Sequence, residues 1–257
     1  MTASFLELSD VSKRFGGIRA VSNVSLTIPQ GEITSVIGPN GAGKTTLFNL
    51  IAGQIKPSAG TVRFEGERID RRSPDEIARR GILRSFQNTM ILPQLTVQEH
   101  IETAAFLATI GRPIDLLWRR KINRAKLAAI ETTESVLQLT GLASQRDVAA
   151  ETLSYGLQKI LGIGMAMAAK PRLLLSDEPA AGLNGAETER MEALLRAVHA
   201  SGVSIILVEH DLRLVMRLSR HVVVLGQGEL VLEGTPDQVR HDPRFIEIYL
   251  GGEADAA

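Results

Sequence analysis

The chain has 257 residues, of which 44% are hydrophobic and 23% are charged, so it can bury the core of one large domain or of two small ones. Its 29 basic and 29 acidic side chains balance, which gives no support to bulk electrostatic binding of nucleic acid, and the lack of cysteine excludes disulfides and thiolate metal sites. No signal peptide is visible, and the apolar stretches are far shorter than the roughly 20 residues that cross a bilayer. We therefore expect a soluble, cytoplasmic chain that reaches a membrane only through a partner.

The first part of the chain has the pattern of strands. Residues 5–8 and 24–28 alternate apolar and polar side chains, which predicts two strands with one face in a core. Between them, residues 13–17 predict a turn that carries the aromatic Phe15. The apolar run 33–37 predicts a further strand, which leads into a glycine-rich loop and then a helix.

That glycine-rich loop is the strongest single signal. Its spacing fits the P-loop pattern, and the strand before it and the helix after it supply the context that the motif requires. Successive backbone N–H groups of such a loop wrap a phosphate chain, and the helix points its positive end at the same place. We predict that Lys44 reaches the outer phosphates and that the Thr45 hydroxyl ligates Mg²⁺; the alternative is a turn that binds nothing. The predicted loop consists of Gly38, Pro39, Asn40, Gly41, Ala42, Gly43, Lys44, Thr45 and Thr46.

The rest of the chain alternates between predicted strands and helices. The expected elements are a strand at 61–64, a short helix from Ser73 to Gly81, a strand at 82–86, mostly helix from 96 to 140, a helix at 154–169, a strand at 173–177, a helix at 186–200, strands at 203–208, 221–225 and 229–233, and closing helices. Short, continuously apolar strands that alternate with helices favour a parallel sheet covered on both faces.

The helical stretch is interrupted at 111–113, and the basic, amphipathic segment 114–121 that follows contains Trp118. A solvated helix is the default interpretation of this segment. A helix on a membrane surface and a surface that docks a protein are the alternatives.

The apolar strand at 173–177 ends in an acid pair, Asp177 and Glu178. An acid at the carboxyl end of a parallel strand beside a P-loop can hold Mg²⁺, and a second carboxylate one residue on can face the attacking water. A solvated pair of acids at a strand end is the alternative, but four consecutive apolar or small residues before the pair favour the functional interpretation.

Taken together, these motifs resemble the ATPases of ABC transporters. Five elements occur in that family's order and cover most of the chain: the P-loop, Gln87, the signature-like segment Ser154-Tyr155-Gly156-Leu157-Gln158, the pair Asp177-Glu178, and His210. The resemblance implies an α/β P-loop NTPase of the ABC type, with a mostly parallel core sheet, an N-terminal antiparallel β subdomain and a helical subdomain. The whole chain, 1–257, would be a single ABC ATPase domain, with the helical subdomain inserted at roughly 88–169 and C-terminal helices at 235–250.

The resemblance also implies roles for single residues. Phe15 would stack on adenine, although a core aromatic is the alternative. Gln87 would touch the metal or the lytic water, and its loop would sense a transmembrane partner. Glu178 would be the general base, and His210 would contact the γ-phosphate or hold the water.

The signature residues Ser154, Tyr155, Gly156 and Leu157 would act on ATP bound to a second subunit. A hydroxyl and a glycine at a helix N-terminus suit a phosphate. The active unit implied by the resemblance is therefore a head-to-tail pair of nucleotide domains.

Within the family, the chain is most similar to the ATP-binding subunits of branched-chain amino acid importers. Tyr155 and Asn184, where most ABC ATPases have Gly and Asp, and the insertion around 111–121 point to that branch. The segments that carry this similarity are Arg14-Phe15-Gly16-Gly17, Ser85-Phe86-Gln87-Asn88, Leu153-Ser154-Tyr155-Gly156, residues 177–184, Glu209-His210-Asp211-Leu212, and the stretch from Gly234-Thr235-Pro236 to Tyr249-Leu250-Gly251.

This similarity implies ATP and Mg²⁺ as cofactors and a peripheral position on the cytoplasmic side of the plasma (inner) membrane. The implied partners are two transmembrane permease subunits, a second ABC ATPase subunit (a paralogue or another copy), and indirectly a substrate-binding protein, but no nucleic acid. The alternatives are an importer for urea, amides or aromatic acids, or a lipopolysaccharide exporter motor. A soluble ABC ATPase of translation or DNA repair is disfavoured by the single P-loop and the neutral charge. A regulator without hydrolysis is disfavoured by Glu178.

The signature helix departs from the family pattern. Leu157 stands where Gln is usual, and Gly162 and Gly164 each cost about 1 kcal/mol against Ala inside a helix. Close packing could offset that cost, or the helix could be looser. We expect ATPase activity that is intact but modest, since the P-loop and switch residues show no departure.

Overall fold

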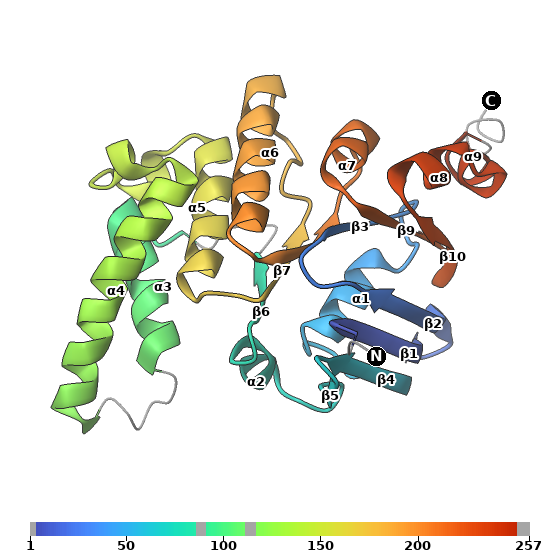
Figure 1. Cartoon of the computed structure of the whole chain (residues 1–257), viewed down its shortest axis with the longest axis horizontal. Helices are drawn as coiled ribbons and strands as arrows, with labels where there is room; N and C mark the ends of the chain where they lie inside the picture. Colours follow the sequence, from blue (N-terminus) through green and yellow to red (C-terminus); the bar gives the residue numbers. More distant parts are fainter. Residues whose placement is uncertain (1–3, 86–90, 111–116, 251–257) are drawn as a thin grey trace. The chain divides into compact units, whose positions relative to one another are not determined.

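The computed structural model describes residues 4–85, 91–110 and 117–250, and they divide into two compact units (Figure 1). The first unit contains the chain up to Ala78, Leu175–Glu178 and the chain from Ser204 onward; the second contains Arg79–Leu174 and Pro179–Val203. The strand Leu173–Asp177 contributes residues to both.

The first unit opens with an antiparallel sheet of four strands in the order β2-β1-β4-β5. The strands are β1 (Leu6–Phe15), β2 (Ile18–Ile28), β4 (Ala59–Phe64) and β5 (Glu67–Arg68). Alternate side chains of β1, β2 and β4 are fully buried, as the alternation predicted.

The turn predicted at 13–17 is wrong in its first half. Lys13, Arg14 and Phe15 continue β1 and pair with Val21, Arg19 and Ile18 of β2, so only two glycines connect the strands. Gly16 has a φ of +58°, in the left-handed region that favours glycine in such a tight connection. The chain thus places Phe15 at the end of a hairpin rather than in a loop.

The first unit also contains the largely parallel sheet that carries the P-loop. Its strands run in the order β10-β9-β3-β8-β7, and β3 (Ile33–Ile37) pairs in parallel with β8 (Ser204–Val208) and β9 (His221–Gly226). Every residue of β3 and β8 is buried, including the polar Thr34, Ser35 and Ser204, as expected for strands of a parallel sheet that is covered on both faces. The strand β7 (Leu173–Asp177) ends at the predicted acid pair.

The predicted alternation of strands and helices fails after β9. The strand β10 (Glu229–Gly234) returns antiparallel to β9 through a tight turn at Gln227 and Gly228, both at positive φ. The helices of this unit are α1 (Lys44–Ile51), α2 (Pro74–Ala78), α7 (Leu212–Leu218), α8 (Pro236–His241) and α9 (Pro243–Leu250). Ser73 caps α2 by accepting a hydrogen bond from the Glu76 amide.

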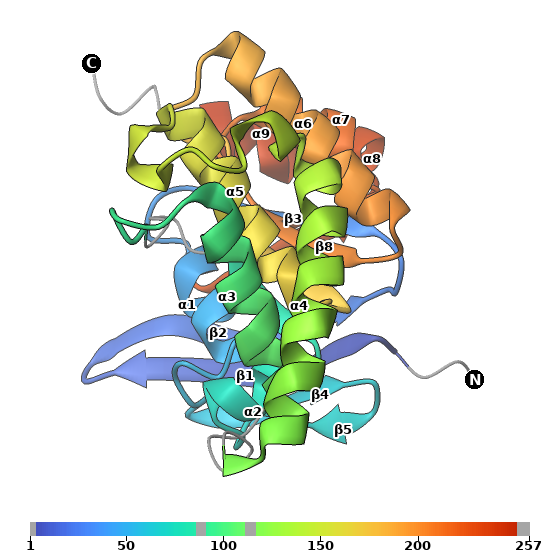
Figure 2. The same ribbon diagram turned by 90° about the vertical axis from the view of Figure 1, so that its left-hand side faces the viewer.

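The second unit is mainly helical. It holds β6 (Ile82–Ser85), α3 (Val97–Ile110), α4 (Arg119–Thr140), α5 (Tyr155–Ala168) and α6 (Gly185–Ala200). Figure 2 shows α3 and α4 running side by side, and both contact α5. The predicted interruption at 111–113 lies outside the described residues. Leu117 and Trp118, just before α4, are exposed.

Gly164 explains one departure of the signature helix. A Cβ at this position would lie 3.1 Å from Thr140 Cγ2 and 3.3 Å from Val136 Cγ1, so the glycine lets α5 approach α4 closely. Tight packing of α5 on α4 therefore offsets part of the stability that a glycine costs inside a helix. Across the ranges that the structure describes, no helix is both long enough and apolar enough to cross a membrane.

Candidate nucleotide-binding site

The P-loop backbone needs its glycines. Gly38, Gly41 and Gly43 have φ values of +151°, +81° and +96°. A Cβ on Gly38 would lie 2.2 Å from the Leu225 carbonyl oxygen, and one on Gly43 would lie 2.4 Å from that of Ala20. The loop is therefore pressed between β9 and β2, in a shape that only glycine permits at these points.

Lys44 lies inside this loop. It is the first residue of α1, its side chain is buried, and its Nζ donates hydrogen bonds to the carbonyl oxygens of Gly38 (2.7 Å) and Pro39 (3.0 Å). Burial lowers the pKa of the Lys44 ammonium, while the nearby carboxylates of Glu178 and Asp177 act in the opposite direction. The structure thus brings the predicted phosphate-binding lysine together with both predicted acids.

Two oxygen-bearing side chains of this region fit a magnesium ion. Thr45 is exposed in the first turn of α1, and Asp177 is buried at the carboxyl end of β7. A hydroxyl and a carboxylate are the hard oxygen ligands that Mg²⁺ takes, usually with several waters and with phosphate oxygens. The donor set therefore suits the metal that the sequence predicts.

Glu178 and His210 are in direct contact. Glu178 has a φ of +48°, and its N–H donates to the carbonyl oxygen of Val208 at the end of β8 (2.9 Å). Its Oε1 lies 2.9 Å from Nε2 of His210, and its side chain is 23% exposed, so water can reach the carboxylate. Asp211 caps α7 through the amides of Arg213 and Leu214, which fixes the backbone beside His210.

Phe15 does not belong to the core. The residue is 49% exposed at the end of the β1–β2 hairpin, with the Lys13 ammonium 5.1 Å from its ring centroid. The alternative of a core aromatic is therefore wrong. An exposed ring is available for stacking, which supports the predicted contact with adenine.

The signature segment lies in the second unit. Ser154 is the N-cap of α5, where its hydroxyl accepts a hydrogen bond from the Leu157 amide (3.4 Å), and Tyr155 is half exposed. Gly156 packs on α6: a Cβ there would lie 2.8 Å from Oε1 of Glu187. Larger residues at Gly156 would therefore disturb the start of α6, where Glu187 forms a capping box with Asn184. Gln87 lies outside the described residues.

Tyr249 is the residue of this site that sequence reasoning missed. Its hydroxyl forms a hydrogen bond with the backbone of Gly38, the first P-loop residue. The ring packs against Phe245, with 4.8 Å between ring centroids, and against the core cluster that contains Ile37. The available signal was the family-like stretch ending in Tyr249-Leu250-Gly251, but no local pattern connects the end of a chain to its P-loop.

We expect Tyr249→Phe to raise the KM for ATP about fivefold with little change in kcat. The substitution keeps the ring and removes one hydrogen bond, which contributes about 1 kcal/mol. Steady-state kinetics with the purified chain would measure the effect. Tyr249→Ala should also lower the melting temperature, because the packing on Phe245 is lost. A lower kcat with unchanged KM in Tyr249→Phe would contradict a role in holding the loop.

A pH-dependent stability measurement tests the burial of the Tyr249 phenol. Burial raises the pKa of Tyr249 from 10.0 to about 12, and the hydrogen bond with Gly38 only partly opposes this. The unfolded chain thus loses the phenolic proton first, so the stabilisation is complete below pH 10 and is lost as the pH rises through about 12. The unfolding free energy of the wild type, measured in urea, should fall more steeply across this range than that of Tyr249→Phe.

Two family models match the chain. The model of the ABC transporter family matches residues 21–181, and the model of the branched-chain amino acid ATP-binding cassette transporter matches residues 229–255. The second match covers β10, α8 and α9, including Tyr249.

Proteins of known name and structure are similar over nearly the whole chain. The high-affinity branched-chain amino acid transport ATP-binding protein BraF of Pseudomonas aeruginosa is 39% identical over 253 residues, which cover 98% of this chain and 99% of BraF. The ADP conformation of MJ1267, an ATP-binding cassette of an ABC transporter, has a TM-score of 0.82 at 31% identity and covers 96% of this chain and 99% of its own. The dimeric structure of MJ0796, a bacterial ABC transporter cassette, has a TM-score of 0.73 at 26% identity, with 90% and 98% covered.

Proposed function

This chain belongs to the ABC transporter family of ATP-hydrolysing cassettes, and we propose that it powers the import of branched-chain or related amino acids. The predicted fold and the predicted ATPase activity are confirmed by this membership. One observation carries the importer assignment: the C-terminal residues 229–255 match the model of branched-chain amino acid cassettes, in addition to the general ABC match.

The first unit supplies the residues that the hydrolysis step needs. A water oxygen forms a bond to the γ-phosphorus while the bond from that phosphorus to the bridging oxygen of ADP breaks, and Glu178 accepts the proton of the water. His210 holds the Glu178 carboxylate through the 2.9 Å contact, and the Lys44 ammonium balances charge on the outer phosphates. Thr45, Asp177 and Gln87 would hold Mg²⁺, which supplies further charge neutralisation when bound.

The proposal places the signature segment in a partner's site. Ser154 offers a hydroxyl at a helix N-terminus, and Tyr155 presents an exposed face beside it. The dimeric MJ0796 cassette supports an active unit of two such subunits. We further propose that Phe15 contacts adenine in the first unit, so that one ATP is held by the P-loop of one subunit and by Ser154 and Gly156 of the other.

The proposed complex has two transmembrane permeases, this chain, a second ABC ATPase and a separate substrate-binding protein. The chain would lie peripherally on the cytoplasmic side of the plasma (inner) membrane. The second ATPase would be a paralogue or another copy of this chain. The whole cassette, 1–257, would act as one ABC ATPase domain with its helical subdomain at roughly 88–169.

Deletion of this chain in its host should abolish ATP-dependent uptake of leucine, isoleucine and valine. Uptake of radiolabelled amino acids by whole cells measures the effect, and complementation with the wild type should restore it. The matched control is complementation with Glu178→Gln, which should leave uptake at the background level. Unchanged leucine uptake together with lost uptake of urea, an amide or an aromatic acid would instead assign one of the alternative importers.

A further inference from the structure

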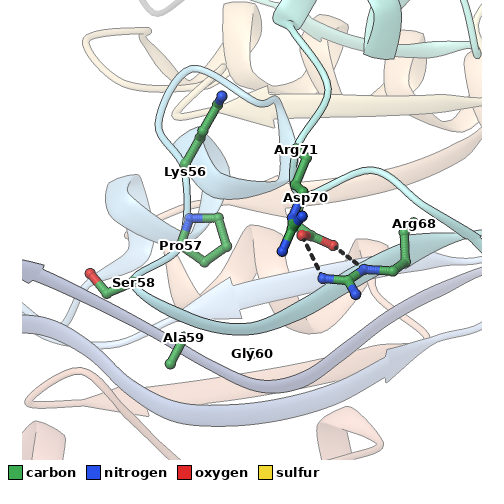
Figure 3. A pocket seen from close by; sticks show the side chains of 8 residues that line it. All are labelled: Lys56, Pro57, Ser58, Ala59, Gly60, Arg68, Asp70 and Arg71. Carbon is green, nitrogen blue, oxygen red and sulfur yellow. Dashed lines mark hydrogen bonds and ion pairs between the residues drawn. The ribbon is translucent and has the colours of Figure 1, made fainter.

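A basic cavity lies in the first unit, and none of its lining residues belongs to the P-loop. It has a volume of about 300 Å³ and is bounded by residues 56–60, at the end of the connection from α1 and the start of β4, and by Arg68 of β5 with Asp70 and Arg71 just after it (Figure 3). Formal charges of +1 on Lys56, Arg68 and Arg71 and −1 on Asp70 give this lining a net charge of +2. The cavity therefore attracts anions.

One wall of the cavity is held in a fixed geometry. The Arg68 guanidinium donates two hydrogen bonds to Asp70, from Nε (3.1 Å) and Nη2 (3.0 Å), as Figure 3 shows. Asp70 is buried, and it also accepts a hydrogen bond from the Val62 amide (3.3 Å). Burial opposes ionisation of Asp70, but these hydrogen bonds outweigh it and hold its pKa below the ordinary value. Arg68 is thus oriented by a permanent carboxylate and keeps further N–H donors for a ligand.

The other two cations have no such carboxylate. Within the described ranges, neither the Lys56 ammonium nor the Arg71 guanidinium forms a hydrogen bond or an ion pair. Arg68 and Arg71 also line a second hollow, of about 370 Å³, with Arg72 and Glu76, which pair with each other at 3.2 Å. Arg71 therefore lines both hollows. Among the described residues, no carboxylate pairs with its guanidinium, whereas the Arg68 guanidinium is held by Asp70.

Two guanidinium groups on one lining match the chemistry of a phosphate group, and the same lining includes the Lys56 ammonium. The planar fork of arginine binds two phosphate oxygens at once, and lysine adds a point charge. The lining offers no aromatic side chain, so it does not favour a base or another flat apolar group. We propose that this cavity is a second anion site, which binds the phosphate group of a small soluble ester or of a lipid headgroup through Arg68, Arg71 and Lys56.

The test uses the full chain with its P-loop occupied by a stoichiometric amount of a non-hydrolysable ATP analogue. Inorganic phosphate is titrated, and the arginine Nε–Hε signals are followed by NMR. The signals of Arg68 and Arg71 should shift saturably, and Arg71→Gln and Lys56→Gln should each weaken phosphate binding at least about fivefold, as expected for a lost charged hydrogen bond. Arg240→Gln, an exposed arginine on α8, is the matched control and should bind as the wild type does.

A second arm distinguishes the two sources of the phosphate group. Cosedimentation with vesicles of phosphatidylcholine alone, or mixed with phosphatidic acid, is measured for the same variants. Binding to the mixed vesicles that Arg71→Gln abolishes and Arg240→Gln preserves assigns a lipid headgroup. Phosphate binding without vesicle binding assigns a soluble ligand. Arginine signals whose shifts do not saturate with phosphate, or an equal phosphate affinity in the wild type and in Arg71→Gln, would overturn the proposal. The melting temperatures of the variants verify that they fold.

Discussion

Glu178→Gln should lower the ATPase kcat by a factor of about 10²–10⁴, the range that general base catalysis contributes, and should leave ATP binding intact. Glutamine keeps the size of the side chain and can still contact Nε2 of His210, but it cannot accept a proton from water. The P-loop and Lys44 are unchanged, so the phosphates remain bound. Because ATP then persists between two cassettes, the variant should also accumulate as a dimer in the presence of ATP.

Two measurements check this expectation. Phosphate release gives kcat, and size-exclusion chromatography with and without ATP gives the oligomeric state. The matched control is Glu229→Gln, an exposed glutamate at the start of β10, which should hydrolyse ATP at the parent rate. If Glu178→Gln also hydrolysed ATP at the parent rate, another group would be the base.

The residues nearest to the chemistry were also the easiest to predict, because their signals are local. Gly38 to Thr46 form a contiguous loop between a strand and a helix, and Asp177 ends an apolar strand, so neighbours in the sequence carry the whole pattern. The backbone explains why that pattern is strict: a Cβ at Gly38 or Gly43 would collide with a carbonyl oxygen. The contact between Glu178 and His210, in contrast, joins two strand ends that only the fold brings together. The resemblance assigns both residues to the hydrolysis step but does not predict their contact, and their spacing in the sequence does not predict it either.

The errors of prediction have physical causes as well. The sequence of Lys13, Arg14 and Phe15 does not predict a strand, because these residues are partly or fully exposed in β1 and the end of the strand therefore shows no alternation of apolar and polar side chains. The hairpin of β9 and β10 departs from the predicted alternation of strands and helices because the short turn Gln227-Gly228 returns the chain antiparallel to β9, with no helix between the two strands. Tyr249 was missed since its partner Gly38 lies near the other end of the sequence. Strand register and long-range contacts depend on which faces of the strands and helices the rest of the fold covers. The amino-acid composition does not specify this coverage.

The structure also changes how the signature helix is interpreted. Gly164 looked like a cost to helix stability, but a side chain there would meet Thr140 and Val136 of α4. Gly156 likewise avoids Glu187 at the start of α6. These two glycines serve close packing within the second unit, so they give no reason to expect a loose helix. The expectation of modest turnover then depends on Leu157 and Gly162.

Lys44→Met should lower the affinity for ATP by a factor of about 10–150 and should reduce hydrolysis at sub-saturating ATP at least as much. A charged hydrogen bond contributes about 1.5–3 kcal/mol, which corresponds to that range, and methionine keeps the length of the side chain without its charge. The fold should survive this substitution. Burial of the Lys44 ammonium carries a desolvation cost that methionine avoids, and this gain opposes the loss of a hydrogen-bond donor to the carbonyl oxygens of Gly38 and Pro39. The melting temperature without nucleotide should therefore change little.

Titration with a fluorescent ATP analogue measures the affinity, and thermal unfolding with and without ATP measures the stabilisation that binding provides. ATP should raise the melting temperature of the wild type but hardly that of Lys44→Met, because the stabilisation follows the ratio of ligand concentration to Kd. Lys126→Met, which changes an exposed lysine on α4, is the control that should behave as the wild type. An unchanged Kd in Lys44→Met would mean that the ammonium does not contact the phosphates, and that the loop amides and the N-terminus of α1 hold ATP without it.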